Sequence, residues 1–331
     1  MSQGRRVLVI SLSNIGDAML TLPVLDLVRR RHPDAAITVL AGERSAVVFA
    51  RRPDVAEVVV AQRRGPWRAT VALWRRLRRQ RFDLVIDLRH TLWPLLLGAP
   101  RHSPLVRHPP RRLMHMRDRH LWRAQQALGT SEEPSQPGAQ IPPEDAAFAH
   151  RWLRQAGVPD GARLVAISPG ARSHIKRWTS AGFAAVADRL IADTHCHVLL
   201  TGESSEREVV ASVTARMRQP GAHVAAGATT LGQLAALLQQ CRLLITNDSA
   251  TMHVAAYLGV PVVAVFGPTD PRKYAPRGPH DRVIQRPLHC VPCEASRCRF
   301  HHECMDETTP EEVFAAACAI LDAAPASLTN P

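Results

Sequence analysis

The feature that most constrains this chain is an alternation of short apolar runs with amphipathic stretches, which occurs in both halves of the sequence. The first half has apolar runs that predict buried strands at residues 6–11, 36–41, 58–61 and 83–88. The second half has runs of the same kind at residues 164–168, 197–201, 243–246 and 262–266. Helical periodicity separates these runs, for example in residues 18–31 and 180–192. The pattern predicts an α/β protein with two doubly wound units, each built on a parallel sheet.

The length supports two domains, because 331 residues are more than one hydrophobic core usually holds. We place the domains at residues 1–158 and 159–331. Residues 98–143 are rich in Pro, Arg and His, which predicts loop and linker. Near the end of the chain, Thr309 and Pro310 followed by Glu312 predict a capped helix over residues 310–323.

The positive charge is confined to one half of the chain. Residues 1–156 contain 26 Lys and Arg against 13 Asp and Glu, whereas residues 157–331 contain 16 of each, so the first half carries the whole net charge of +13. This indicates either an anionic partner of the first domain or an arginine-rich solvated surface. Nucleic acid is a poor match, because only 5% of the residues are aromatic and no nucleic-acid-reading motif occurs.

The N-terminus has the basic residues and the apolar run of a signal peptide but lacks its other features. Arg5 and Arg6 precede an apolar run, but Asn14 and Asp17 interrupt it and no small-residue cleavage site follows. No apolar run approaches the ~20 residues of a spanning helix. We therefore expect a cytoplasmic protein.

Polar residues follow several of the predicted strands, where doubly wound folds place their sites. Asp17 follows the first strand beside Gly16 and is either a general base or a partner of a helix dipole. Lys176 follows the strand at 164–168 and is one of only two lysines, so its compact ammonium is a candidate phosphate ligand. Glu203 and Glu206 could accept bonds from ribose hydroxyls or could simply be first-turn acids.

The segment at residues 247–253, Asn-Asp-Ser-Ala-Thr-Met-His, leads from a strand into a helix. Its amide groups could hold a diphosphate at the positive end of the helix dipole, or it could be an ordinary N-cap. No Walker or G-x-G-x-x-G motif is present.

Taken together, these motifs resemble glycosyltransferase family 9, the heptosyltransferases of lipopolysaccharide core assembly. The resemblance is carried by RVLVISLSNIGDAMLTL at 6–22, Pro-Gly-Ala at 169–171 with Lys-Arg-Trp at 176–178, Thr-Gly-Glu at 201–203, TNDSATMHVAAYL at 246–258 and FGPTDP at 266–271. It looks closest to the heptosyltransferase II branch. It implies a GT-B architecture, with an acceptor-binding N-terminal Rossmann-like domain facing a nucleotide-sugar-binding C-terminal one across a cleft.

The resemblance also implies the reaction. A heptose moves with inversion from ADP-L-glycero-β-D-manno-heptose to the lipopolysaccharide inner core, on a Kdo–lipid A or heptosyl-Kdo–lipid A type acceptor, and catalysis requires no cofactor. Carried over by position, the residue roles are a base at Asp17, a diphosphate ligand at Lys176, a ribose ligand at Glu206, a donor-sugar contact at Asp248, and a diphosphate loop with Ser249, Ala250 and His253. Relatives often have Gly at position 250.

The implied acceptor is an anionic glycolipid, which gives the charge asymmetry a reason and suggests a peripheral position on the cytoplasmic face of the inner membrane. The arginine-rich residues 63–81 and 101–123 are then candidate acceptor contacts. Alternatives remain open: a GT-B-like enzyme with another nucleotide-sugar donor, an epimerase, or a basic nucleic-acid-binding protein.

Four of the seven cysteines form a cluster. Cys290, Cys293, Cys298 and Cys304 have the spacing C-x2-C-x4-C-x5-C. A reducing compartment argues against disulfides, so this spacing makes them candidate ligands of a structural zinc ion, with an iron–sulfur cluster or free thiols as the alternatives.

Overall fold

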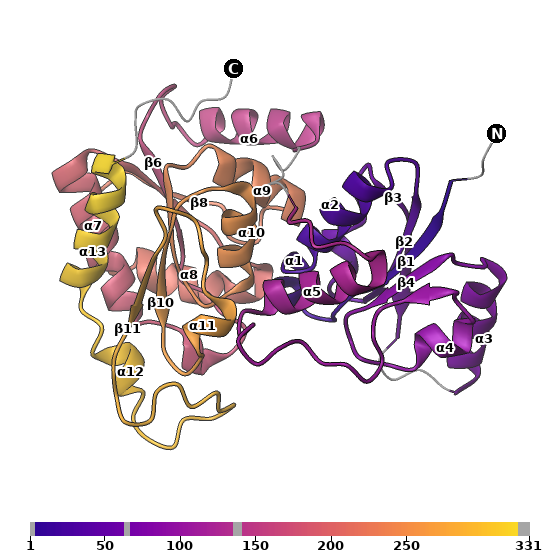
Figure 1. Cartoon of the computed structure of the whole chain (residues 1–331). Coiled ribbons are helices and arrows are strands. Elements are labelled where there is room, and N and C mark those ends of the chain that lie inside the picture. Colours follow the sequence, from indigo (N-terminus) through magenta and orange to yellow (C-terminus); the bar gives the residue numbers. More distant parts are fainter. Residues whose placement is uncertain (1–3, 63–66, 135–140, 324–331) are drawn as a thin grey trace. The chain divides into compact units, whose positions relative to one another are not determined.

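A computed structural model describes residues 4–62, 67–134 and 141–323. They belong to two compact units, Met1–Pro137 and Gly138–Pro331 (Figure 1). Each unit is α/β, as the sequence predicted.

Within the described part of the first unit, five parallel strands form one sheet in the order β3-β2-β1-β4-β5. The strands are β1 (Arg6–Ile10), β2 (Ala36–Gly42), β3 (Val55–Ala61), β4 (Leu84–Asp87) and β5 (Arg101–His102). The helices are α1 (Ile15–Met19), α2 (Leu22–Arg31), η1 (Ala46–Val48), α3 (Trp67–Arg79), α4 (Trp93–Leu97) and α5 (Met116–Leu128). The four strands predicted for this half are confirmed.

The second unit holds a six-stranded parallel sheet among its described residues, in the order β11-β10-β9-β6-β7-β8. The strands are β6 (Leu164–Ser168), β7 (His197–Leu200), β8 (Ala222–Val224), β9 (Leu243–Asn247), β10 (Val262–Phe266) and β11 (Arg282–Gln285). The helices are α6 (Pro143–Gln155), η2 (His174–Lys176), α7 (Ser180–Thr194), η3 (Ser204–Glu206), α8 (Arg207–Thr214), α9 (Leu231–Gln239), α10 (Ala250–Leu258), α11 (Pro271–Tyr274), α12 (Glu303–Asp306) and α13 (Pro310–Ala323).

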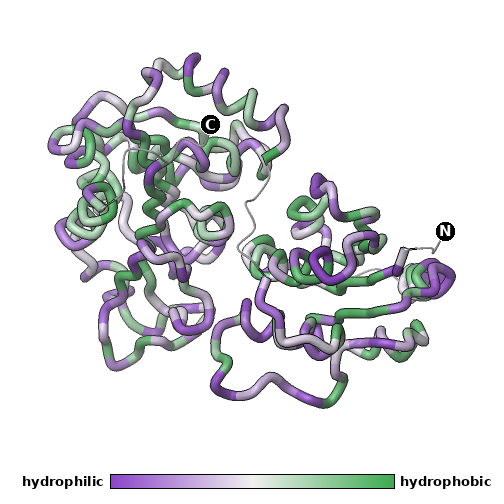
Figure 2. Tube along the Cα trace, turned by 45° about the horizontal axis from the view of Figure 1, so that its top comes forward, coloured by the Kyte–Doolittle hydropathy of each residue, from purple (hydrophilic) through white to green (hydrophobic). Residues whose placement is uncertain are grey.

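The cores follow from the apolar runs. β6, β9 and β10 are buried along their whole length, because helices cover both faces of a parallel sheet. Figure 2 shows hydrophobic residues along the central strands of each unit and hydrophilic ones on outer helices and loops. In the second unit, the Trp178 ring packs edge-on against Phe183 within the core.

The prediction of loop and linker for residues 98–143 is partly wrong. It contains β5 and the 13-residue helix α5, and only residues 135–140 of the predicted linker lie outside the described residues. The apolar period of an amphipathic helix is interrupted in α5, because the inward face of this helix includes His120 and Arg123, both buried.

The boundary between the two units differs from the predicted boundary at residue 158, because α6 belongs to the second unit. α6 packs against α9 of the second unit, and the division between the units falls after Pro137. A helix that buries its apolar side on α9 belongs to that core, whatever its place in the sequence. Across the described residues, we find no helix with the length and apolar run that crossing a bilayer requires.

Candidate active site

Both sheets have a topological switch point. In the second unit, the chain runs from β6 outward through β7 and β8, and then returns to place β9 on the other side of β6. The pairing sets Ser168 at the end of β6 opposite Thr246 in β9. The loops that follow these two strands therefore leave the sheet side by side, at the edge where doubly wound folds bind ligands.

Lys176 and Asp248 meet at this edge. The Lys176 Nζ donates to Asp248 Oδ2 at 2.6 Å, although 72 residues separate them. Asp248 follows β9 directly and is 8% exposed, whereas the Lys176 side chain on η2 is one-third exposed. An ammonium has three donor hydrogens, so Lys176 can keep Asp248 and still bond to an anion. Two predicted donor ligands thus form one charged pair.

Asn247 holds the lysine loop in place, a role that the sequence analysis missed. Its buried amide accepts from the Trp178 backbone N–H at 2.9 Å and donates to the Pro169 carbonyl at 2.8 Å. These bonds tie both ends of the loop at 169–178 to the end of β9. A polar residue at the last position of an otherwise apolar strand was the available signal.

The start of α10 has no side-chain cap from its N-cap residue. Ser249 is the N-cap in extended conformation, and its own side chain makes no cap hydrogen bond to the first turn. The Ser249 hydroxyl is occupied by Thr246 Oγ1 at 3.1 Å. Ala250 begins the helix, and His253 is buried one turn further on. The predicted loop residues are therefore together at a helix start that follows Asp248, where the helix dipole favours negative charge.

Glu206 lies against the same set of loops. Its Oε2 accepts from the Glu203 backbone N–H at 2.8 Å, which closes a capping box at η3. The carboxyl occupies the space that Gly170 leaves: a Cβ at residue 170 would lie 2.2 Å from Glu206 Cδ. Burial, the largest cause, raises the pKa of Glu206. A half-buried carboxyl next to the turn after β6 is positioned to accept hydrogen bonds from hydroxyl groups.

Asp17 belongs to the first unit, at the equivalent switch point between β1 and β4. It lies in the first turn of α1 and its Oδ2 accepts from Asn14 Nδ2 at 3.0 Å. The side chain is half-buried, so it is held by a neighbour and still open to solvent. This placement suits a group that exchanges a proton with a bound molecule.

Arg123 is a correction to the predicted acceptor contacts at 101–123. It is 1% exposed and donates from Nε to the Asp87 carbonyl at 2.7 Å and from Nη2 to the Pro104 carbonyl at 2.8 Å. It therefore fixes the loop after β4 and binds no acceptor. The exposed arginines of this range are Arg101, Arg107, Arg111 and Arg112. In the other predicted range, residues 63–66 lie outside the described residues.

The four clustered cysteines line one cavity of about 340 Å³, with Ile175 of η2 on its wall. Among the described residues, however, no three His, Cys, Asp or Glu side chains come together as a metal-ligand set. Burial and the neighbouring thiols raise the pKa of Cys304 to about 11, so its thiol is protonated at neutral pH. The arrangement does not fit a formed zinc site, and the zinc ion stays a prediction.

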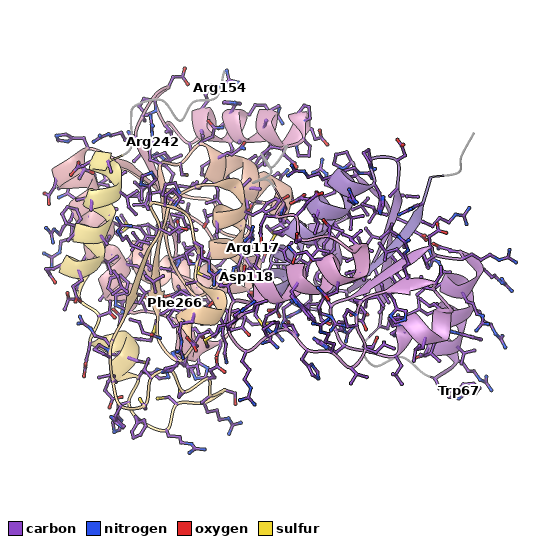
Figure 3. All side chains as sticks on the ribbon, in the orientation of Figure 1. Trp67, Arg117, Asp118, Arg154, Arg242 and Phe266 are labelled. Atoms are coloured by element: carbon purple, nitrogen blue, oxygen red, sulfur yellow. The ribbon has the colours of Figure 1, made fainter. Side chains whose placement is uncertain are left out.

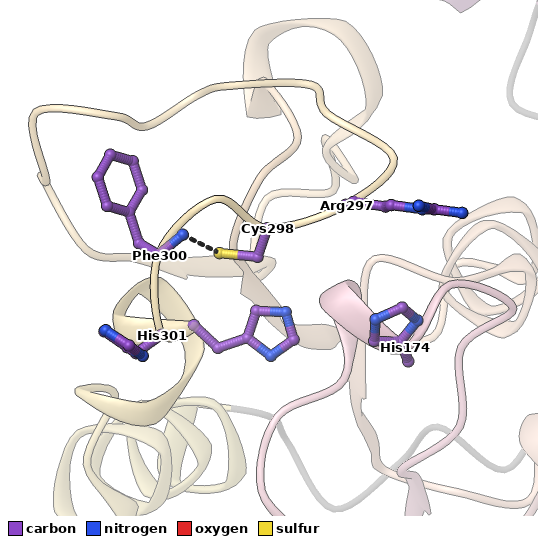
Figure 4. A pocket seen from close by; sticks show the side chains of 6 residues that line it. His174, Arg297, Cys298, Phe300 and His301 are labelled. Carbon is purple, nitrogen blue, oxygen red and sulfur yellow. Dashed lines mark hydrogen bonds between the residues drawn. The ribbon is translucent and has the colours of Figure 1, made fainter.

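A second hollow, of about 540 Å³, lies beside η2. Figure 4 shows the side chains that line it, and these are His174, Arg297, Cys298, Phe300, His301 and His302. The His174 and His302 rings are 5.8 Å apart. The hollow thus shares with the Lys176–Asp248 pair the short helix η2, which carries both His174 and Lys176.

Comparison with known proteins gives a consistent result. The model of the family described as glycosyltransferase family 9 (heptosyltransferase) matches residues 102–303. Lipopolysaccharide heptosyltransferase 3 of Escherichia coli is 28% identical, over 77% of this chain and 81% of its own. The crystal structure of a family 9 glycosyl transferase from Veillonella parvula has a TM-score of 0.82 at 26% identity, covering 98% and 99% of the two chains. E. coli ADP-heptose LPS heptosyltransferase II has a TM-score of 0.77 at 26% identity, covering 96% and 98%.

Proposed function

The chain belongs to glycosyltransferase family 9, with the two Rossmann-like domains of GT-B enzymes, and we propose that it transfers a heptose with inversion from ADP-L-glycero-β-D-manno-heptose to a lipopolysaccharide inner-core acceptor. Its relatives, which include heptosyltransferases of types 2 and 3, support heptose transfer to the lipopolysaccharide core. The acceptor that we propose is of the Kdo–lipid A or heptosyl-Kdo–lipid A type. The observation that carries the proposal is the Lys176–Asp248 pair at the start of α10.

The two residues of this pair have opposite charges and bind different parts of the donor. The Lys176 ammonium and the amides at the start of α10, which the Ser249 side chain does not cap, lie at the same edge of the sheet, so they take the diphosphate. Asp248 has only acceptor oxygens and takes hydroxyl groups of the heptose. Glu206, beside the turn after β6, accepts from the ribose hydroxyls. The diphosphate, the heptose and the ribose of the nucleotide sugar then each have a ligand of suitable chemistry in the second unit.

The bond changes need one base and one site for negative charge. Asp17 removes the proton from the acceptor hydroxyl while its oxygen attacks the anomeric carbon. The bond from that carbon to the diphosphate oxygen breaks, and ADP leaves with the electron pair. The charge that develops on the leaving oxygen is stabilised by Lys176 and by the amides near residues 249–253. Attack opposite to the leaving group inverts the anomeric configuration.

These residues supply the required charge themselves. A cation and oriented amides perform the task that a divalent metal performs in other transferases, so we infer that transfer requires no metal ion.

A panel of nucleotide sugars tests the donor. Ligands that bind the native state raise the melting temperature according to RT ln(1 + [L]/Kd), so ADP-heptose should raise it more than GDP-, UDP- or dTDP-sugars at equal concentration. NMR of the product formed on Kdo–lipid A then reports the anomeric configuration. A larger shift with another nucleotide would overturn the ADP assignment, and donor turnover without acceptor would indicate an epimerase.

A further inference from the structure

Apolar side chains are exposed together on the outer side of α3 and α4 in the first unit. Trp67 is 71% exposed at the start of α3, and Leu92, Leu95 and Leu96 are 65%, 56% and 51% exposed on and just before α4. Figure 3 shows Trp67 pointing outward beyond α3 and α4. Large apolar residues exposed in one place mark an interaction site more often than isolated ones do.

The two helices hold this apolar group in a fixed arrangement. Trp74 of α3 donates from Nε1 to the Leu96 carbonyl at 2.9 Å, and Arg78 donates to the same carbonyl. Pro94 and Leu97 lie on the inward face of α4 and are buried. Leu95 and Leu96 therefore point outward because the core side of the short helix is already occupied.

Arginines of α3 lie next to the apolar group: the Arg68 guanidinium is 5.8 Å from the centre of the Trp67 ring, and Arg78 bonds to the Leu96 carbonyl. Arg68, Arg75 and Arg79 recur at the spacing of one helical face, and all three are exposed. The ion pair that α3 makes involves Arg76, with Glu57, whereas Arg75 and Arg79 have no ion pair with any residue that the structure describes. We define the α3–α4 surface as Arg68, Arg75 and Arg79 with Trp67, Leu92, Leu95 and Leu96.

The positive charge of this region is compensated only in part, since Arg76 of α3 forms an ion pair with Glu57 of β3. From residue 67 to residue 112 the sequence has eleven arginines and two acidic residues, Asp83 and Asp87. Asp83 accepts from the Arg6 backbone, and Asp87 is fully buried with its carboxylate bonded to Arg89 N and Thr91. Neither acid is available to neutralise the arginines of α3.

We propose that the α3–α4 surface binds the face of an anionic phospholipid bilayer. Leucines and a tryptophan that project from a basic helix pair match the interfacial region of a membrane, where the apolar groups enter the acyl boundary and the guanidinium groups meet the phosphates. Charge complementarity selects the occupant: an uncharged apolar partner would leave the arginines unpaired. The inference goes beyond heptose transfer, since it needs only phospholipid and holds for any acceptor.

Vesicle flotation with the full chain tests this proposal. Vesicles that mix phosphatidylcholine with anionic phosphatidylglycerol, which gives the bilayer a negative surface potential, should carry the protein upward, and pure phosphatidylcholine vesicles should not. Raised salt should weaken binding, because exposed charges are screened beyond a Debye length of ~8 Å at physiological ionic strength. No glycolipid or nucleotide is present, so the result is independent of the transferase assay.

Two variants separate the apolar from the charged contribution. Leu95→Glu/Leu96→Glu should weaken binding at least about tenfold, because two side chains lose their burial in the interface. Arg75→Gln/Arg79→Gln should weaken it about fivefold for each arginine. These residues are exposed, so thermal unfolding should match the parent and show that the variants are folded.

Matched controls lie in the second unit. Val224→Glu replaces an exposed apolar residue on β8, and Arg151→Gln/Arg154→Gln removes two exposed arginines of α6. Both should bind vesicles like the parent. Trp67 gives a further readout: its fluorescence should shift to the blue on vesicles, and the shift should be lost in Trp67→Phe.

The proposal is overturned if the parent binds both vesicle types equally or neither type. It is also overturned if the leucine variant binds like the parent, or if the second-unit controls lose binding to the same extent. Retention on duplex DNA that depends on Arg75 and Arg79 but not on Leu95 and Leu96, without vesicle binding, would assign this surface to nucleic acid instead.

Discussion

Replacing Gly170 with alanine should push the Glu206 carboxyl out of its position and weaken nucleoside binding. A Cβ at residue 170 would lie 2.2 Å from Glu206 Cδ, 2.3 Å from Oε1 and 2.5 Å from Oε2. Carbon atoms in ordinary contact are ~3.5–4.0 Å apart, so the carboxyl must move by more than about 1 Å. Residue 170 does not have a positive φ, so alanine fits the backbone and the effect is steric.

The displacement has two costs. The Glu206 bond to the Glu203 backbone is lost, which costs roughly 0.5–1.5 kcal/mol of stability. If Glu206 binds the ribose, a charge-assisted bond to the nucleoside is lost as well. Such a bond contributes about 1.5–3 kcal/mol, so the Kd should rise about 10- to 150-fold for both ADP and adenosine.

Calorimetry with ADP and adenosine on four proteins measures this effect: the parent, Gly170→Ala, Glu206→Ala and the double variant. Because Gly170 acts through Glu206, the double variant should bind no worse than Glu206→Ala. Gly202→Ala is a graded control: its Cβ would lie 3.2 Å from Glu206 Oε2, so the carboxyl shifts less and binding falls less. Unchanged adenosine binding by Gly170→Ala and Glu206→Ala would refute the ribose role.

Four further predictions concern single residues. Asp17→Asn should lower kcat ~10²- to 10⁴-fold and leave ADP affinity unchanged; steady-state and binding assays that find kcat within a few-fold of the parent would exclude Asp17 as the base. Lys176→Ala should raise the Kd of ADP about 10- to 150-fold but not that of adenosine, and an equal loss of both in calorimetry would reject the phosphate role. Arg123→Ala should lower the free energy of unfolding by roughly 2–4 kcal/mol in urea titrations, whereas Arg119→Ala on the same helix should change it little; equal effects would contradict the buried role. Because burial raises the pKa of Glu206, the folded state binds the carboxyl proton more tightly than the unfolded state does. The free energy of unfolding should therefore fall as the pH rises from the ordinary pKa of 4.5 through the raised pKa of the folded state. Thermal melts measured against pH should show this fall for the parent and not for Glu206→Gln.

Local signals in the sequence were sufficient for much of the fold. The start of the helix predicted at 310–323 is the start of α13, because Thr309 and Glu312 form the capping contacts with each other and need no distant partner. The strands at 164–168 and 262–266 were likewise predicted with the bounds of β6 and β10. Continuous apolar runs identify strands that are buried on both faces.

The sequence failed where tertiary contacts reverse local preferences. α5 was missed because the residues on its inward face include His120 and Arg123, which periodicity assigns to a polar surface. Burial lowers the pKa of His120 to about 4, so its imidazole is neutral in the core. Arg123 is buried because four groups, among them the Asp87 and Pro104 carbonyls, accept its hydrogen bonds, and these acceptors come from the ends of two strands and the segments that follow them.

The sequence by itself determined that polar residues follow apolar strands, and it therefore determined which loops could carry chemistry. Only the tertiary structure decided which of these residues meet. Lys176 and Asp248 form a pair because β6 and β9 are neighbours in register, with Ser168 opposite Thr246. That pairing depends on the crossover that returns the chain from β8 to the other side of β6. The distance between the two charges is thus set by backbone hydrogen bonds between strands that lie far apart in the sequence, and no local pattern records it.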